Sequence, residues 1–537
     1  MDATTPWWQR GTIYQIYPRS FQDRNGDGIG DLPGITRRLD YLQWLGIDAI
    51  WLSPIFLSPM ADFGYDIADY TAIDPRFGTL ADFDRLVAEA HRRGLKVILD
   101  YVPNHTSDQH PWFVASRSSR AHPQRDWYLW RDAAPDGGPP TNWLSVFGGG
   151  AWTWDVATEQ YYYHAYLAAQ PDLNWRHAAV QEAMLAVLRF WLERGVDGFR
   201  VDALRQLMKD EQLRDNPPNP AYHPGQGPYE SLLPVYTTDR PEIHPILARM
   251  RQVLDAYEAR MLLGELYLPI DRLVTYYGDT GNELHLPGNF HLIHTPWQAR
   301  EIAALIARYE AALPPGGWPN WVLSNHDRSR LVSRVGQAQA RVAAMLLLTL
   351  RGTPTLYYGD ELGMWDQVIP PACVQDPWEK QVPGLGLGRD PVRTPMLWDD
   401  SDHAGFTIGA PWLPLHAPAA VLNVTAQRQA PTSMLTLYQR LLALRRATPA
   451  LAVGAYTPLA ETADEVLAYV RTAAQQTCLV ALNFGTQAQQ ITLDAVSRPG
   501  QVVLSTHLDR AGEPVRATLA LRGDEGVMGM LDSGEAS

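Results

Sequence analysis

Short runs rich in β-branched and aromatic residues alternate with longer amphipathic runs along most of the chain. The first part reads strand, helix, strand, helix, strand in "TIYQIYPRSF", "GITRRLDYLQWLG", "DAIWLSP", "LADFDRLVAEAHRRG" and "LKVILDYVPNH". The alternation returns after residue 175 and adds strands in "VDGFRVDA", "MLLGELY", "LHLPGNF", "WPNWVLSNHD" and "GTPTLYYGDE". Eight such strands with intervening helices predict a (β/α)8 TIM barrel. The open doubly wound sheet is disfavoured because the chain has no glycine-rich dinucleotide fingerprint.

Two interruptions of the strand–helix alternation, and a change to short alternating segments near the end of the chain, predict the other domains. Residues 105–175 are rich in Trp, Tyr, Pro and Gly and are too long for a plain loop, so we expect an inserted subdomain after strand 3. A second, Pro-rich excursion follows strand 4. Short alternating segments from residue 454 onward predict a C-terminal antiparallel β-sandwich domain, residues 454–537, with residues after about Gly523 as a disordered tail. The barrel would then comprise residues 1–104 and 176–453.

Charge and composition exclude several classes of partner. The net charge of -14 argues against nucleic acid and against anionic membranes, because both require a basic surface. The chain lacks a basic and apolar leader and any run of about 20 apolar residues, and its 2 cysteines fit a reduced compartment. A cytoplasmic protein without a membrane partner is therefore expected. The 19 Trp and 24 Tyr leave aromatic rings for a pocket in which sugars could stack.

The candidate chemistry lies in acids at the ends of predicted strands, where a barrel places its active site. Asp202, Glu265 and Asp327 occupy such positions in "GFRVDA", "GELY" and "SNHD". Arg200 and Asp202 share a strand face, so we expect the arginine to lower the pKa of Asp202, while the apolar run before Glu265 would raise its pKa. One ionised and one protonated carboxyl group is the combination that glycoside cleavage uses.

A structural reading of these residues competes with the catalytic one. A single acid at a strand end more often caps the next helix or pairs with a neighbour. Three acids on successive elements, one beside an inward arginine and one beside a histidine, favour chemistry. His105 and His326 each follow an asparagine at a strand end, where they are either satisfied core side chains or donors to substrate hydroxyls. Neither belongs to a Cys/His cluster or an H-E-x-x-H motif, so a zinc site is not expected.

The stretch "DRNGDGIGD" begins like a calcium loop. Asp23, Asn25, Asp27 and Gly28 match the metal-loop template, but Gly34 stands where the bidentate glutamate would be. The segment before it reads as a strand and not as a long helix, which argues against an EF-hand sensor.

Taken together, these motifs resemble the α-amylase superfamily, glycoside hydrolase family thirteen, and within it the oligo-1,6-glucosidase and α-glucosidase branch. The resemblance covers nearly the whole chain and rests on "IYQIYPRSFQDRNGDGIGDLPGI", "GYDIADY", "VPNHTS", "GFRVDA", "GELY", "SNHDRSR" and "RTPMLWD" in the family's order. It implies that Asp202 is the nucleophile, that Glu265 is the general acid/base, and that Asp327 is the carboxylate that holds sugar hydroxyls and stabilises the transition state.

The resemblance also implies a glucose pocket and a structural ion. In the pocket Arg393 would pair with Asp66 and close it on the non-reducing sugar, which means exo action on a small oligosaccharide. The full set of implied substrate contacts is Asp66, Tyr65, His105, Arg200, His326, Arg393 and Ala203, with Phe147 and Phe290 as further candidates. A structural Ca²⁺, or Mg²⁺ in a six-coordinate version, would be bound by Asp23, Asn25, Asp27, the carbonyl of Ile29 and Asp31. The chemistry itself needs no cofactor.

The residue after the nucleophile separates specialists within this branch. Isomaltose-cleaving members carry valine there, whereas this chain has Ala203, which favours α-1,4 linkages in maltose and malto-oligosaccharides. Phosphorylated disaccharides are less expected because the chain is acidic overall. An α-1,6-glucosidase, a transglucosylase and a non-catalytic sugar-binding or scaffold homologue stay open as alternatives.

Overall fold

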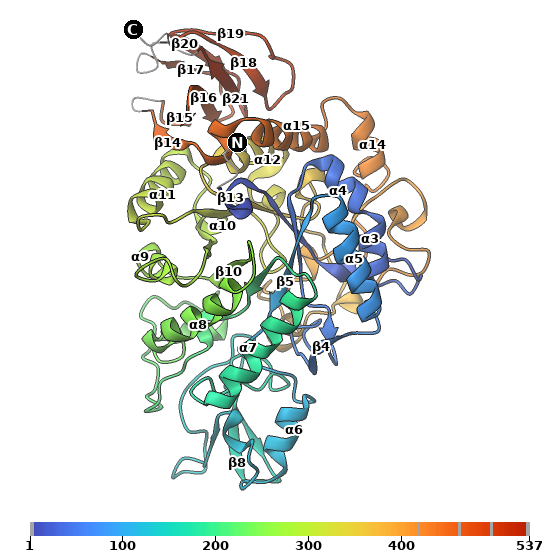
Figure 1. Ribbon diagram of the computed structural model, residues 1–537, viewed down its shortest axis with the longest axis vertical. Coiled ribbons are helices and arrows are strands. Elements are labelled where there is room, and N and C mark those ends of the chain that lie inside the picture. Colours follow the sequence, from blue (N-terminus) through green and yellow to red (C-terminus); the bar gives the residue numbers. More distant parts are fainter. Residues whose placement is uncertain (1–4, 417, 460–462, 494–497, 533–537) are drawn as a thin grey trace.

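The computed structural model describes residues 5–416, 418–459, 463–493 and 498–532. Its centre is an eight-stranded parallel sheet that curves into a nearly closed barrel, as the sequence predicts (Figure 1). The strands are hydrogen-bonded in the order β11-β10-β9-β5-β2-β1-β13-β12, and the two end strands contact each other. Their bounds are β1 Ile13–Ile16, β2 Ala49–Leu52, β5 Lys96–Tyr101, β9 Gly198–Val201, β10 Met261–Leu266, β11 Leu286–Asn289, β12 Asn320–Val322 and β13 Thr353–Tyr357.

Helices cover the outside of this barrel. Because the strands are buried on both faces, they read as continuous apolar runs, while the helices carry one apolar face each. In α5 that face holds Phe83, Leu86, Val87 and Ala90, and a capping box between Thr79 and Asp82 starts the helix. The main barrel helices are α3 Leu32–Arg37, α4 Leu39–Leu45, α5 Leu80–Arg92, α7 Ala178–Glu193, α8 His244–Asp255, α11 Ala299–Ala312, α12 Leu331–Thr349 and α15 Met434–Ala447.

Shorter elements lie between these. The short helices are α1 Trp7–Arg10, α2 Pro18–Phe21, α9 Ile270–Leu273, α10 His291–His294, α13 Pro377–Gln381, α14 Val424–Gln429 and α16 Pro449–Val453. A small hairpin is formed by β3 Phe56–Leu57 and β4 Asp69–Ile73. In the described part of the chain no helix is long and apolar enough to cross a membrane, and Cys373 and Cys478 both have free thiols.

The segment after β5 has its own secondary structure at the end of the molecule opposite the C-terminal sheets (Figure 1). It contains α6 Pro111–Ser118 and a three-stranded sheet of β6 Trp130–Arg131, β7 Trp152–Asp155 and β8 Gln160–Tyr163. A bridge between His105 and Asp172 joins the two ends of the segment. These elements fit an inserted subdomain, although its boundaries at residues 105 and 175 stay a prediction.

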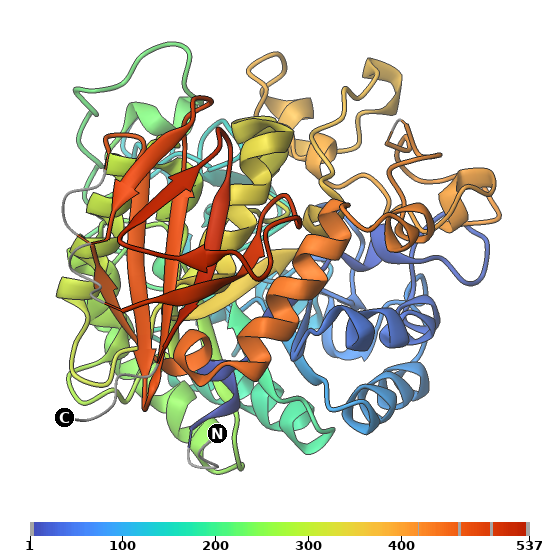
Figure 2. The ribbon, with the colours of Figure 1, turned by 90° about the horizontal axis from the view of Figure 1, so that it is seen from above.

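The C-terminal part is an antiparallel β-sandwich, as predicted. Its larger sheet has the order β14-β15-β16-β21-β18-β19, and a pair of strands, β17 and β20, packs on it through apolar side chains such as Ile491 and Leu519. Seen from above, these strands lie over α12 and beside α15 (Figure 2). The bounds are β14 Ala455–Pro458, β15 Val466–Ala473, β16 Gln476–Asn483, β17 Gln489–Thr492, β18 Gly500–Ser505, β19 Pro514–Val515, β20 Thr518–Leu521 and β21 Gly526–Leu531.

Three local expectations are corrected. The first strand ends at Ile16, because Pro18 starts α2 and its ring cannot continue a central ladder. The first predicted helix is divided into α3 and α4 at Arg38, whose ψ is 3°. Residues after Gly523 are not a tail as far as the structure describes them, because β21 pairs with both β16 and β18. Residues 533–537 lie outside the described part.

Candidate active site

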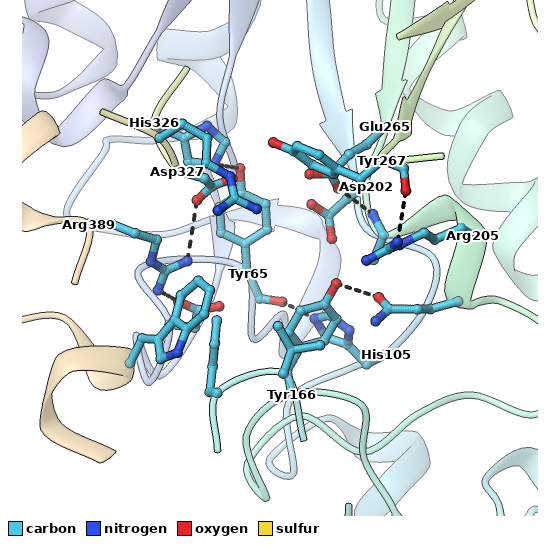
Figure 3. A pocket seen from close by; sticks show the side chains of 17 residues that line it. Tyr65, His105, Tyr166, Asp202, Arg205, Glu265, Tyr267, His326, Asp327 and Arg389 are labelled. Atoms are coloured by element: carbon cyan, nitrogen blue, oxygen red, sulfur yellow. Dashed lines mark hydrogen bonds and ion pairs between the residues drawn. The ribbon is translucent and has the colours of Figure 1, made fainter. Parts of the chain in front are cut away.

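A pocket with about 760 Å³ of empty space opens at the carboxyl ends of the barrel strands. This is the size of a small-molecule site and the end at which barrels of this type place their chemistry. It brings together eight of the residues expected from the sequence: Tyr65, His105, Phe147, Asp202, Ala203, Glu265, His326 and Asp327. The other lining residues are Asp62, Val146, Tyr166, Arg205, Gln206, Tyr267, Arg328, Trp378 and Arg389 (Figure 3).

The floor of the pocket is organised around one buried guanidinium group. Arg200 lies on β9 opposite Asp100 on β5, and its Nη1 donates to Asp100 Oδ1 at 2.8 Å and to Asp202 Oδ1 at 2.5 Å. Its Nη2 lies 2.9 Å from Glu265 Oε1. The two nitrogen atoms of one fork therefore hold Asp202 and Glu265 side by side, from two neighbouring strands.

Burial reverses the expected pKa of Asp202. It raises the pKa of Asp202 well above its ordinary value; Arg200 opposes this, but the charges of Glu265 and Asp100 add to it. Burial likewise raises the pKa of Asp100 to about 6. Arg200 thus lowers the pKa of Asp202 as expected, but the expected net lowering is wrong for the free protein, because burial outweighs a guanidinium group that is shared by three carboxyl groups.

Ala203 has a left-handed backbone conformation, with φ 47° and ψ 29°. Its N–H donates to Glu265 Oε2 at 2.8 Å, so the two oxygen atoms of Glu265 are bound by Arg200 and by this backbone amide. The turn after β9 therefore fixes the orientation of the Glu265 carboxyl group. A non-glycine residue at positive φ is uncommon and often marks a functional site.

His326 and Tyr65 form a flat wall beside these acids. Their rings are parallel within 3° with centroids 5.5 Å apart, and Tyr65 Oη lies 2.7 Å from His326 Nε2. Gln15 Nε2 lies 2.7 Å from His326 Nδ1 on the other side of the ring. Burial lowers the pKa of His326 well below its ordinary value and that of His105 to about 4, so both side chains are neutral at pH 7.

Asp327 is held as a carboxylate. Burial alone would raise the pKa of Asp327, but the neighbouring His326, Arg393 and Arg389 keep it well below its ordinary value. Arg393 Nη2 lies 2.9 Å from Asp327 Oδ1, and Arg389 Nη1 lies 3.5 Å from the same oxygen atom. Asp327 therefore presents a negative charge to the pocket at any pH near neutrality.

An ion pair that the sequence interpretation missed closes one end of the pocket. Arg389 Nη2 lies 2.7 Å from Asp62 Oδ1 and 2.8 Å from Asp376 Oδ1, and both Arg389 and Asp62 are buried. The ring of Phe147 lies 4.8 Å from the Arg389 guanidinium carbon and covers it. The pocket is therefore blind at this end.

This arrangement corrects two of the expected contacts. Arg393 pairs with Asp327 and not with Asp66, and it lies behind the pocket. The carboxylate of Asp66 accepts the N–H groups of Ala61 and Asp62, so it shapes the loop that carries Asp62. Asp62 and Arg389 lie four residues before Asp66 and Arg393, outside the motifs "GYDIADY" and "RTPMLWD", so the motifs alone did not point to the acid and the arginine that face the pocket.

Phe290 also lies outside the pocket. It stacks on Tyr267 with ring centroids 4.4 Å apart and an angle of 14° between the planes. Tyr267 separates Phe290 from the acids and itself lines the pocket. Tyr267 follows Glu265 by two residues, and Arg205 and Arg328 likewise follow Asp202 and Asp327 closely in sequence; this proximity was the available signal for all three.

The proposed calcium loop is closed by its own hydrogen bonds. Asp23 accepts the N–H groups of Gly26 and Gly28, and Asp31 accepts those of Arg24 and Asn25. Over the described residues, no group of three His, Cys, Asp or Glu side chains converges as a metal site would require. The ion therefore stays a prediction.

A family model and several known proteins are similar to this chain. The model of the α-amylase family, described as "Alpha amylase, catalytic domain", matches residues 15–454. A "Probable alpha-glucosidase" of Rhizobium meliloti (strain 1021) is 45% identical over 505 residues, 91% of each chain. An "Oligo-1,6-glucosidase" of Halalkalibacterium halodurans is 41% identical over 517 residues, 90% of this chain and 91% of that one. The crystal structure of an "alpha-glucosyl transfer enzyme" is 43% identical with a TM-score of 0.92, and the match covers 98% of this chain and 100% of that one.

Proposed function

The chain belongs to the α-amylase family of glycoside hydrolases, and from that premise we propose that it is an exo-acting, retaining α-glucosidase. It would release α-glucose from the non-reducing ends of short α-glucosides and prefer α-1,4 linkages, as in maltose. The observation that carries the proposal is the pair of carboxyl groups, Asp202 and Glu265, held side by side on one guanidinium fork. Retaining glycosidases need two such groups close together, one as nucleophile and one as acid.

The reaction assigned to this pair has two steps. In the first, an oxygen atom of Asp202 bonds to the anomeric carbon as the glycosidic bond breaks, and the proton of Glu265 moves to the leaving oxygen. In the second, water attacks the anomeric carbon and gives a proton to Glu265. The bond between the anomeric carbon and Asp202 breaks at the same time and leaves Asp202 free as a carboxylate. Two inversions return the α configuration. These steps require that, when substrate is bound, the proton of the cluster around Arg200 is on Glu265 and Asp202 is ionised.

The blind end of the pocket supports exo action. A sugar ring that enters toward Asp202 meets the Asp62–Arg389 ion pair at the far end and the Tyr65 and His326 rings beside it. Asp327 would accept hydrogen bonds from the sugar hydroxyls, and neutral His105 and His326 would contribute further polar contacts. Because the chain of sugars cannot continue past the ion pair, only a terminal glucose fits.

The direct test is proton NMR of the anomer released from the non-reducing glucose in the first minutes on maltose and on isomaltose, measured as the excess over the anomeric mixture that the reducing glucose contributes. We expect this glucose to appear as the α anomer, and faster from maltose. An early excess of β-glucose would contradict a retaining mechanism. If neither these sugars nor sucrose or trehalose is turned over, the non-catalytic sugar-binding or scaffold alternative takes first place.

The linkage preference can be tested at Ala203. Ala203→Val is expected to shift the maltose to isomaltose ratio of kcat/KM toward isomaltose by about tenfold or more, because methyl-scale changes in a pocket contribute about 1–3 kcal/mol. A β-branched side chain tolerates positive φ less well than alanine, so Ala203→Val should also lower stability. Ala203→Gly is the matched control, since it keeps the conformation and adds no methyl group. An unchanged ratio in Ala203→Val removes the basis for the α-1,4 preference.

Transglucosylation is the second candidate. The crystal structure of the similar "alpha-glucosyl transfer enzyme" favours it, and the same acids would serve, because the covalent intermediate can pass to a sugar hydroxyl instead of water. New glucosyl linkages that appear on maltose as fast as free glucose would decide for transfer.

We also retain the structural calcium as a proposal, bound by the loop of Asp23, Asn25, Asp27, Ile29 and Asp31. Its oxygen-only ligands suit calcium, and the two carboxylate oxygen atoms of Asp27 accept one hydrogen bond each, which leaves each of them a lone pair for an ion. Dialysis against a chelator is expected to lower the Tm, and calcium at 100 times its Kd should restore about 2.7 kcal/mol of stability. Asp27→Ala should lose this response, because Asp27 bonds only within the loop. The proposal would be contradicted if the protein contained no metal and its Tm were the same with and without the chelator.

A further inference from the structure

Two arginines stand on the side of the pocket that faces away from the blind end. Asp327 and Arg389 lie on one side of Asp202 and Glu265, whereas Arg205 and Tyr267 lie on the other (Figure 3). Arg205 Nη1 donates to the carbonyl oxygen of Tyr267 at 2.9 Å. Arg328 lies over the Tyr267 ring, with its guanidinium carbon 5.1 Å from the ring centroid. We call these three residues the Arg205–Tyr267–Arg328 cluster.

The arginines of this cluster differ from the others at the site. Arg200, Arg389 and Arg393 each form an ion pair with at least one carboxylate. Among the described residues, neither Arg205 nor Arg328 has a carboxylate partner, and the buried Nε of Arg328 donates to nothing. Both line the pocket. The cluster thus presents two guanidinium groups with unused donors, although the chain has a net charge of -14.

The position of the cluster fixes what it can contact. The terminal glucose occupies the space between the acids and the Asp62–Arg389 ion pair, so the leaving group must extend to the opposite side. The cluster lies there, close in sequence and space to Glu265, which protonates the leaving oxygen in the proposed function. Its donors therefore face the leaving group and, in a transfer reaction, the acceptor.

We propose that the Arg205–Tyr267–Arg328 cluster recognises leaving groups and acceptors that carry an anionic oxygen group, a carboxylate or a phosphate. This inference rests on the proposed α-glucosidase function and narrows its substrate class. A guanidinium fork matches the geometry of both anions and binds them by charge-assisted hydrogen bonds. Stacking on Phe290 holds the Tyr267 ring over which the Arg328 guanidinium lies, and the backbone carbonyl of Tyr267 holds Arg205, so both charges are held in place. Phosphorylated or acidic glucosides thereby become candidates despite the acidity of the chain.

The competing explanation is that these arginines only balance the charge of the catalytic acids or bind neutral hydroxyl groups. In that case a negative charge on the leaving group would bring no advantage. The test must therefore compare substrates of equal shape that differ in charge.

The experiment uses the full chain and the α-glucosides of 4-hydroxybenzoate and 4-hydroxybenzamide. We expect kcat/KM for the carboxylate to exceed that for the amide by about tenfold at low salt, and the advantage to shrink at high salt. Arg205→Gln and Arg328→Gln should each reduce the charged-to-neutral ratio several-fold, and Arg328→Lys should restore part of it. Differences in leaving-group reactivity cancel when variants are compared with the wild type. Arg308→Gln, at an exposed position on α11, is the charge-matched control and should keep the wild-type ratio.

A second arm identifies the anion. Maltose phosphorylated on its reducing glucose is compared with maltose: a phosphate preference above the carboxylate preference assigns the cluster to sugar phosphates, and the reverse order assigns it to carboxylates. The charged-to-neutral ratios are also measured as ratios of Kd in the Asp202→Asn background, because binding can be measured there without turnover. Ratios that neither arginine variant changes overturn the inference, even when α-glucose is released normally. If no glucoside is turned over, the proposed function fails, while the Kd ratios still decide on the cluster.

Discussion

Replacement of Asp202 by asparagine is expected to lower kcat on maltose by about 10⁴-fold or more, with the fold intact. The amide has the shape of the carboxylate but cannot form the covalent bond to the anomeric carbon. Loss of the Asp202 charge removes a partner of Arg200 but also the repulsion with Asp100 and Glu265, which still pair with Arg200, so stability should change little. The measurement is the initial rate of glucose release, together with the Tm. Asp84→Asn, at an exposed ion pair with Arg194, is the matched control and should keep full activity.

A comparison with Glu265→Gln separates the two roles. The Glu265 variant should lose most activity on maltose and least on glucosides whose leaving group needs no proton, such as 4-nitrophenol. The Asp202 variant should lose activity on both alike. If Asp202→Asn keeps more than a hundredth of the activity, Asp202 is not the nucleophile, and the assignment of the pair fails.

The second large effect is expected at the blind end of the pocket. Arg389→Gln breaks the buried pairs with Asp62 and Asp376 and leaves both carboxylates without their partner. Breaking one buried ion pair costs about 3–5 kcal/mol of stability. Misplacing the terminal sugar by about 1 Å can cost roughly 10²-fold in rate, so we expect kcat/KM for maltose to fall by at least that factor. Binding of glucose itself should weaken, because the ion pair closes the space for the terminal sugar. Arg76→Gln, which breaks a half-exposed pair with Asp74, is the control and should have little effect.

A double-mutant cycle shows whether the two residues act as a pair. Asp62→Asn combined with Arg389→Gln should cost less than the sum of the single changes, because the double variant leaves neither charge unpaired. Circular dichroism and the Tm of each variant separate a folding defect from a binding defect. Additive losses would mean that Asp62 and Arg389 contribute independently, and the closed end of the pocket would need another explanation.

The barrel could be predicted from the sequence because its signals are local. Each strand is a short apolar run bounded by turn residues, and each main helix repeats its apolar face at three- and four-residue intervals; all eight strands lie where the pattern places them. The points at which a strand or helix is interrupted were harder to predict. Pro18 and Arg38 divide elements that the apolar pattern alone would continue. The strand β21 was missed because its partners, β16 and β18, are brought beside it only by the tertiary structure.

The site divides in the same way. Residues at strand ends, such as Asp202, Glu265 and Asp327, are fixed by sequence, because the end of a barrel strand always reaches the same face. The pairing of Asp62 with Arg389 was decided by the tertiary structure, since two loops 327 residues apart meet there and Asp66 and Arg393 stood nearby in sequence as alternatives. The pKa of Asp202 was decided there as well, because the balance between one guanidinium group and three buried carboxyl groups depends on distances and burial, and no linear spacing encodes either.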